Sequence, residues 1–202
     1  MPFETLQSIL MPRYLEIKPD NLHNVLLSEP QNGNKKNTLK SFTITGLTEK
    51  TIVIRLEPLK NNLFFESGKE NKGYDITRYR CKCDYILIAE IDQKGYIFYI
   101  EMKSSNIDDH AKFQILRGRC VLEYLRFTLQ NVTGIKDALS DYEDRYVVAC
   151  KIPMERGSTN PKKQFLDGLK PNGANTSIDC IYPLDLNDKE TVSIKELIYD
   201  PQ

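Results

Sequence analysis

Histidine is scarce in this sequence: the 202 residues contain only His23 and His110. Two imidazoles give little support to a histidine-based nuclease or a serine–histidine hydrolase. His110 follows an apolar strand closely enough to assist a site at its end. The sequence also lacks a GxxxxGK[ST] phosphate loop and a GxGxxG fingerprint. We therefore do not expect the protein to use ATP or a dinucleotide.

Net charge is also absent, because 28 lysines and arginines balance 28 aspartates and glutamates. This balance argues against a histone-like or otherwise strongly basic binding protein. It does not exclude an enzyme whose acidic metal site offsets a local basic surface. An apolar content of 40% and a length of 202 residues suit one domain, residues 1–202, with one sizeable core.

Cysteine usage and apolar runs indicate a cytoplasmic protein. The five cysteines are an odd number without a disulfide-rich spacing, so we expect reduced thiols. Cys81 and Cys83 form a Cys-x-Cys pair, but zinc needs four ligands and no second pair follows. The longest apolar runs are too short to cross a bilayer, and the N-terminus lacks a signal-peptide pattern. We expect no membrane partner.

The most informative stretch is Cys83–Ser105, which predicts two apolar strands joined by a polar turn at Asp92–Gly95. The turn's glycine supplies the permissive backbone. Charge interrupts the apolar pattern at Asp84, Glu101 and Lys103. Folding about the turn brings residue 84 level with residues 101–104, and the period of two places Glu101 and Lys103 on one face. Two carboxylates and an ammonium are therefore expected at one end of the sheet.

This arrangement resembles the PD-(D/E)XK, or restriction-endonuclease-like, nuclease superfamily. Asp84, Glu101 and Lys103 match its motif, with Cys83 in place of the family's proline, and the resemblance covers about residues 40–150. Only the copy at Glu101 ends an apolar strand, follows a paired strand that carries an acidic residue, and precedes a helix. Other copies of the motif, fitting it strictly or loosely, occur at Glu16–Lys18, Glu70–Lys72 and Asp92–Lys94.

The resemblance implies an α/β fold whose central mixed β-sheet is flanked by α-helices. It also implies a Mg²⁺-dependent phosphodiesterase that cleaves DNA, with Mn²⁺ able to substitute. Asp84, Glu101 and the backbone carbonyl of Met102 would bind the metal, and Lys103 would act on the attacking water. A role in restriction or anti-phage defence follows by analogy, with a homodimer or a partner subunit of a defence system as the expected assembly.

Several basic and amide side chains are candidates for contact with nucleic acid. The segment Tyr74–Arg80 alternates basic and aromatic residues, which suits either a DNA-facing strand or an edge strand with a polar face. The basic, glycine-containing segment 154–175 suits either a DNA-contacting or dimer arm or a plain surface loop. The helix after the Glu-x-Lys strand borders the site. The candidates are Arg78, Arg80, Lys112, Gln114, Lys162 and Lys163.

Other elements follow from the hydrophobic pattern. We expect an N-terminal helix over Phe3–Leu15, in which Glu4 or, just beyond it, Glu16 is a further candidate carboxylate. The longest helix spans Asp108–Gln130, with Gly118 permitting close packing on the sheet. The remaining expectations are a hairpin of Lys40–Thr45 with Thr51–Leu56, a strand Arg145–Ile152 parallel to the second arm of the central hairpin, a strand Ser177–Leu184, and a strand or helix Thr191–Tyr199.

Three other interpretations of the charged residues stay open. Glu101 and Lys103 would form a plain ion pair at a strand end, with Asp84 capping a turn. The chain would be a catalytically inactive, nuclease-like module that binds nucleic acid or assembles with a partner. Finally, it would be a structural or regulatory protein unrelated to nucleases, in which Asp84 and Glu101 lie far apart. The sequence does not distinguish DNA from RNA, or endonuclease from exonuclease action.

Overall fold

The computed structural model describes residues 2–10, 15, 23–28, 41–56, 82–103, 109–136, 138–151, 181–187 and 189–198. Its elements are α1 (Pro2–Ile9), β1 (Asn24–Ser28), β2 (Ser41–Thr45), β3 (Thr51–Arg55), β4 (Tyr85–Ile91), β5 (Lys94–Lys103), α2 (Asp109–Thr128), the π-helix η3 (Leu129–Thr133), β6 (Glu143–Cys150), β7 (Ile181–Asp185), β8 (Thr191–Ser193) and the 3₁₀-helix η4 (Ile194–Leu197).

A five-stranded mixed sheet with the order β3-β4-β5-β6-β7 forms the centre of the molecule. The pairings of β3 with β4 and of β4 with β5 are antiparallel, whereas β5, β6 and β7 run parallel. The predicted central hairpin and the predicted parallel strand after the long helix are therefore confirmed. Because β5, β6 and β7 are parallel, their carboxyl ends lie at one edge of the sheet.

The turn of the central hairpin is tighter than predicted. Ile91 pairs with Lys94, so only Asp92 and Gln93 lie between the strands. Both have positive φ angles, 51° and 68°. This is the backbone geometry of a two-residue turn that matches the twist of the strands.

Gly95 lies inside β5, opposite Glu90, and not in the turn as predicted. A Cβ atom at this position would lie 2.5 Å from Cδ1 of Tyr142. Glycine is therefore needed here because the Tyr142 ring packs directly on the backbone, and the permissive turn backbone comes from the two residues before it.

The predicted hairpin of residues 40–45 with residues 51–56 does not form. Both segments are strands, but β2 belongs to a second, three-stranded sheet with the order β1-β2-β8, while β3 joins the central sheet. Gly46, with φ at 77°, lies directly after β2. Burial alternates along β2, whereas β3 is buried at four successive positions. The two strands thus have different surroundings.

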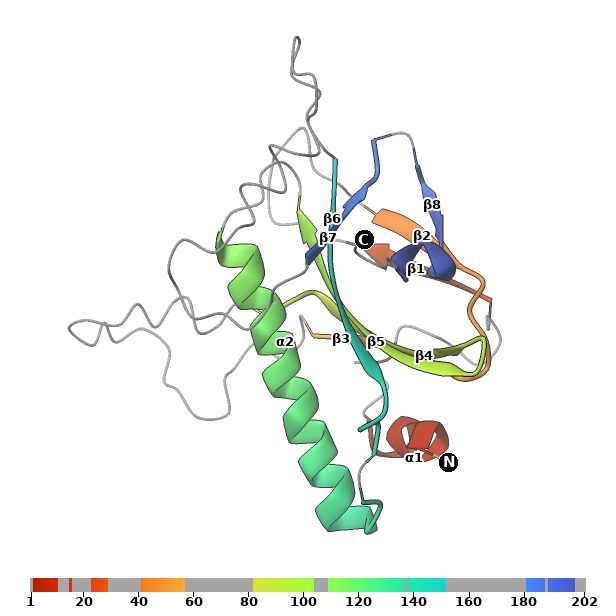
Figure 1. Ribbon diagram of the computed structural model, residues 1–202, viewed down its shortest axis with the longest axis vertical. Helices are drawn as coiled ribbons and strands as arrows, with labels where there is room; N and C mark the ends of the chain where they lie inside the picture. Colours follow the sequence, from red (N-terminus) through yellow and green to blue (C-terminus); the bar gives the residue numbers. More distant parts are fainter. Residues whose placement is uncertain are drawn as a thin grey trace, which may run out of the picture.

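Three layers result, as Figure 1 shows: α2 on one face of the five-stranded sheet and β1, β2 and β8 on the other. Between the two sheets lies one apolar cluster, which includes Leu27, Phe42, Leu87 and Phe98. The other cluster joins the central sheet to α1 and α2. The described helices α1 and α2 thus share one face, and strands cover the opposite face.

Helix α2 lies close to the sheet because of Gly118. A Cβ atom there would lie 2.2 Å from Sγ of Cys83 and 3.3 Å from Cδ1 of Tyr99. The predicted close approach is confirmed. The helix widens into a π-turn at η3 and ends at Gly134, whose left-handed backbone caps it.

The chain ends differ modestly from expectation. Helix α1 is shorter than the predicted Phe3–Leu15, and Thr191–Tyr199 contains both a strand and a 3₁₀-helix, β8 and η4. The predictions for segments 74–80 and 154–175 lie outside the described residues. In the described part of the chain, no helix is long and apolar enough to span a membrane. The coarse fold class, mixed α/β, is as predicted.

Candidate functional site

Asp84 sits where β4 begins, directly beside the end of β5. Tyr85 pairs with Ile100, so Asp84 is level with Glu101, as the hairpin register predicted. The backbone N–H of Met102 donates a hydrogen bond of 2.7 Å to Oδ2 of Asp84. This bond fixes the Asp84 carboxylate beside Glu101, so the interpretation that places these two acids far apart is wrong.

Glu101, Lys103 and Gln114 form a chain of polar contacts from β5 to α2. Nζ of Lys103 lies 2.9 Å from Oε1 of Glu101 and donates a hydrogen bond of 2.5 Å to Oε1 of Gln114. Nε2 of Gln114 donates to the carbonyl of Lys82 at 3.4 Å. The carbonyl of Gln114 accepts a 2.7 Å bond from the N–H of Cys83. Gln114 therefore ties the helix to the strand that carries Asp84.

The Glu101 carboxylate is deeply buried, with 2% of its side chain exposed. Burial and the nearby charge of Asp84 raise the pKa of Glu101 well above its ordinary value, while Lys103 and Gln114 act in the opposite direction. Its second oxygen, Oε2, is buried without a hydrogen-bond partner among the described residues. A buried, unsatisfied carboxylate oxygen is costly. The site is therefore electrostatically incomplete.

Two oxygen-bearing groups at this site are of the chemical type that divalent cations bind. Hard cations such as Mg²⁺ prefer carboxylate and carbonyl oxygens, and Oε2 of Glu101 has no other described partner. Asp84 supplies a second carboxylate, and the carbonyl of Met102 is the predicted third ligand. Within the described ranges, no group of three or more His, Cys, Asp and Glu side chains is placed to hold a metal. The residues present thus supply two carboxylates.

The other predicted site residues differ in their placement. Lys112, at 4% exposure, is buried, which does not favour the predicted phosphate contact. Gln114 is half-buried and bound to Lys103, so it belongs to the site itself. Glu4 is exposed on α1. The following lie outside the described residues: Glu16, Arg78, Arg80, Lys162, Lys163 and the side chain of His110.

The thiol of Cys83, which lies beside the site, is not activated for reaction. Burial raises the pKa of Cys83 well above its ordinary value, and the charges of Glu101 and Asp84 add to this shift. A thiolate is the form that attacks or binds metal. Cys83 therefore does not supply a nucleophile here, and its partner in the Cys-x-Cys pair, Cys81, is outside the described residues.

A third carboxylate, which the sequence patterns did not predict, lies at the same edge of the sheet. Register pairs Lys103 with Cys150 and Cys150 with Asp185, so the three residues form one row across β5, β6 and β7. Asp185 lies close enough to add to the burial that raises the pKa of Cys150 to about 12. Its position at the end of an apolar parallel strand was the available signal.

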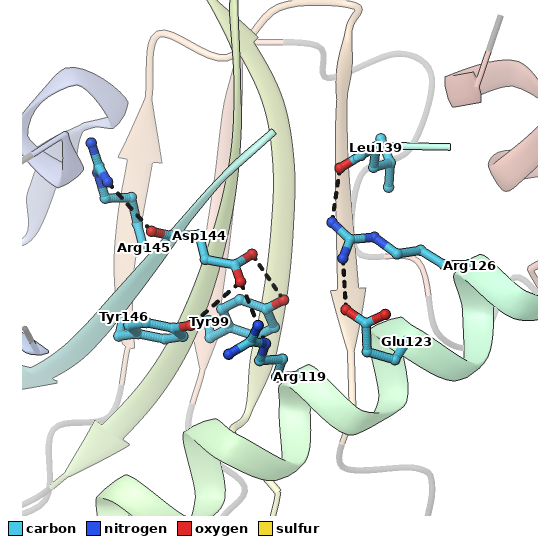
Figure 2. A network of polar contacts seen from close by, with 8 residues as sticks. All are labelled: Tyr99, Arg119, Glu123, Arg126, Leu139, Asp144, Arg145 and Tyr146. Carbon is cyan, nitrogen blue, oxygen red and sulfur yellow. Dashed lines mark hydrogen bonds and ion pairs between the residues drawn. The ribbon is translucent and has the colours of Figure 1, made fainter. Parts of the chain in front are cut away.

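A second polar cluster lies under the same helix and was not predicted either. Asp144, on β6, accepts hydrogen bonds from the hydroxyls of Tyr99 at 3.2 Å and Tyr146 at 3.4 Å. Arg119 of α2 reaches it at 3.6 Å. Figure 2 shows these side chains converging on Asp144. Burial, reinforced by the Asp144 charge, raises the pKa of both Tyr99 and Tyr146, so both hydroxyls stay protonated donors.

The end of α2 is fastened by a separate contact, also seen in Figure 2. Arg126 donates to the carbonyl of Leu139 at 2.8 Å and to Glu123 at 2.6 Å. Leu139 is buried and has a positive φ of 64°, which is costly for a residue of its size. Arg126 thus holds the connection between α2 and β6 in place.

No protein-family model, no curated protein and no solved structure matches the chain. Function is therefore inferred from the geometry of the Asp84–Glu101–Lys103 site.

Proposed function

We propose that the protein is a Mg²⁺-dependent phosphodiesterase that cleaves DNA, built on a restriction-endonuclease-like core. One observation carries the proposal: the buried Glu101 oxygen without a described partner, next to the carboxylate of Asp84 and the ammonium of Lys103. The order of elements supports it, because an acidic residue precedes the hairpin, the Glu-x-Lys sequence ends it, and a helix and a parallel strand follow.

Each residue has a distinct role in this proposal. Asp84 and Glu101, with the Met102 carbonyl, hold the cation. When bound, Mg²⁺ polarises a phosphate and lowers the pKa of a bound water. Lys103 is held between Glu101 and Gln114 with about a fifth of its side chain exposed. In this proposal its ammonium orients the attacking water and stabilises developing phosphate charge.

Gln114 is a positioning residue in the same proposal. Because its Nε2 donates to the Lys82 carbonyl, its Oε1 faces Lys103. Its amide oxygen therefore gives the Lys103 ammonium a second acceptor besides Glu101. Such preorganisation keeps catalytic groups in productive geometry. A role in restriction or anti-phage defence remains an analogy with the family.

The alternative is an inactive, nuclease-like module that binds nucleic acid or assembles with a partner. The number of ligands favours this alternative, since the described residues supply two metal-binding carboxylates and one of these already pairs with Lys103. Metal binding without cleavage would identify it.

The test is cleavage of supercoiled and linear DNA in Mg²⁺, Mn²⁺ or EDTA by wild type, Asp84→Ala and Lys103→Ala. Lys189→Ala is the matched control, because Lys189 also pairs with a glutamate, Glu196, but in an exposed position. We expect cation-dependent cleavage that both site variants lose and the control retains. Calorimetric Mg²⁺ binding without cleavage under every condition would replace the enzyme by the inactive module. Absence of both Mg²⁺ binding and DNA cleavage would refute the proposed metal site.

A further inference from the structure

The ammonium of Lys103 pairs with the carboxylate that the proposed cation would use. Nζ of Lys103 lies 2.9 Å from Oε1 of Glu101, while Oε2 of the same carboxylate is buried without a hydrogen-bond partner among the described residues. The two oxygens of a carboxylate share one carbon, so a cation bound at Oε2 would lie beside the ammonium at Oε1. Two positive charges at such close range repel, and burial strengthens the repulsion. Lys103 in its observed position therefore opposes cation binding.

Gln114 offers the same ammonium a second, uncharged acceptor. Nζ of Lys103 donates to Oε1 of Gln114 at 2.5 Å. The amide is held in this orientation because its Nε2 donates to the carbonyl of Lys82 at 3.4 Å. About a fifth of the Lys103 side chain is exposed, so the side chain is not fully enclosed. The ammonium can therefore leave Glu101 and still keep an acceptor on the protein.

We propose that Lys103 is the counter-ion of Glu101 when no cation is bound, and that Gln114 takes over the ammonium when a divalent cation binds. This inference rests on the proposed function, because it concerns the same metal site. It adds to that function a dependence of cation affinity on Gln114, which is a positioning residue acting through Lys103. The dependence should exist only while Lys103 carries its charge, and this condition makes the exchange testable.

A double-mutant cycle separates this exchange from a simple effect of charge. Lys103→Met should raise the cation affinity at least about tenfold, because a neighbouring positive charge is removed. Gln114→Leu should lower the affinity about tenfold when Lys103 is present, because the displaced ammonium loses a hydrogen-bond acceptor. In the Lys103→Met background, Gln114→Leu should leave the affinity unchanged.

The measurement is Mn²⁺ binding to the full chain, followed by electron paramagnetic resonance of the free ion. Asp84→Ala should abolish the binding, which ties the signal to this site. Lys189→Met is the matched control, because Lys189 also pairs with a glutamate, Glu196, but in an exposed position. Its affinity should equal that of wild type. Circular dichroism checks that each variant folds, and Gln114→Met takes the place of Gln114→Leu if that variant does not.

The outcomes distinguish the exchange from the metal site itself. An equal loss of affinity from Gln114→Leu in both backgrounds overturns the exchange and keeps the site, because Gln114 would then act on Glu101 directly. The same conclusion follows if Gln114→Leu changes neither background, or if Lys103→Met binds Mn²⁺ no more tightly than wild type. Absence of Mn²⁺ binding in both wild type and Lys103→Met overturns the exchange together with the proposed metal site.

Discussion

Two polar clusters lie between the same helix and the same sheet, and their carboxylates differ in how fully their oxygens are hydrogen-bonded. Both oxygens of Asp144 have partners: Oδ1 accepts from Tyr99, and Oδ2 accepts from Tyr146 and lies near Arg119. Glu101 is more deeply buried; its Oε1 pairs with Lys103, but its Oε2 has no hydrogen-bond partner among the described residues.

The difference separates a cluster that stabilises the fold from one that costs stability. Buried polar groups in native proteins are nearly always hydrogen-bonded, and exceptions often have a functional cause. The Asp144 cluster uses its partners to fasten α2 to β6. At Glu101 the raised pKa shows that burial and Asp84 outweigh the help from Lys103. A site kept at a cost to stability is typical of function.

The largest expected effect comes from Glu101→Gln, which keeps the shape and removes the charge. If the comparison holds, DNA cleavage falls on the order of 10³-fold, because the buried metal ligand is lost. The free energy of unfolding at pH 7 should stay equal or increase, since a neutral amide avoids the cost of the buried charge. Urea unfolding and cleavage rates check both parts, with Glu196→Gln at an exposed ion pair as control. A clear loss of stability with Glu101→Gln would instead make Glu101 a structural ion pair.

Asp144→Ala should lower stability and leave the cleavage rate unchanged, the opposite of Glu101→Gln. It leaves the buried hydroxyl of Tyr99 without its acceptor, which costs about 1–3 kcal/mol of unfolding free energy. The cleavage rate of the folded fraction should stay unchanged. Asp144→Asn, which keeps one acceptor oxygen, should cost less in the same urea titration. If Asp144→Ala lowers the cleavage rate and leaves stability intact, the two clusters do not divide into a structural and a functional one.

The sequence predicted the placement of Asp84 beside Glu101 better than the surrounding fold. The register of two strands follows from the hairpin and its turn. The alternating pattern was therefore enough to predict that Asp84 lies beside Glu101, although Gly95 was wrongly assigned to the turn. Gly118 was also predicted correctly, because a glycine within a long helix lowers helix stability and is usually kept for close packing. Local patterns fix such features within one hairpin or one helix.

Features that depend on distant parts of the chain were not predicted. Strand β2 pairs in parallel with β8, nearly 150 residues later, and this pairing separates β2 from β3. The Asp144 cluster joins three elements that only the folded sheet brings together, and Asp185 reaches the site edge through two strand pairings. Tertiary contacts of this kind override local preference.

Gly118→Ala is expected to disturb both clusters, because Gly118 lies on α2 between Gln114 and Arg119. A methyl group would lie 2.2 Å from Sγ of Cys83, so the helix must move or the core must distort. Such overpacking costs about 1–3 kcal/mol, and the cleavage rate should also fall as Gln114 shifts. Adding Cys83→Ala, which removes the blocking sulfur, should restore most of both losses. If the double variant is no better than Gly118→Ala, helix propensity or another contact controls the spacing.

The smallest effect concerns pH and Mg²⁺, and it distinguishes the clusters without removing a contact. Because the folded-state pKa of Glu101 is raised, its contribution to stability is complete below about pH 4.5 and is lost as pH rises through the folded-state value. Mg²⁺ should reverse this loss at pH 7, by about 1.4 kcal/mol at ten times its dissociation constant. Thermal unfolding with Mg²⁺ or EDTA measures the shift, which Glu101→Gln should abolish and Asp144→Asn should retain. An equal shift in wild type and Glu101→Gln would place the cation elsewhere, and the unsatisfied oxygen of Glu101 would then not mark a metal site.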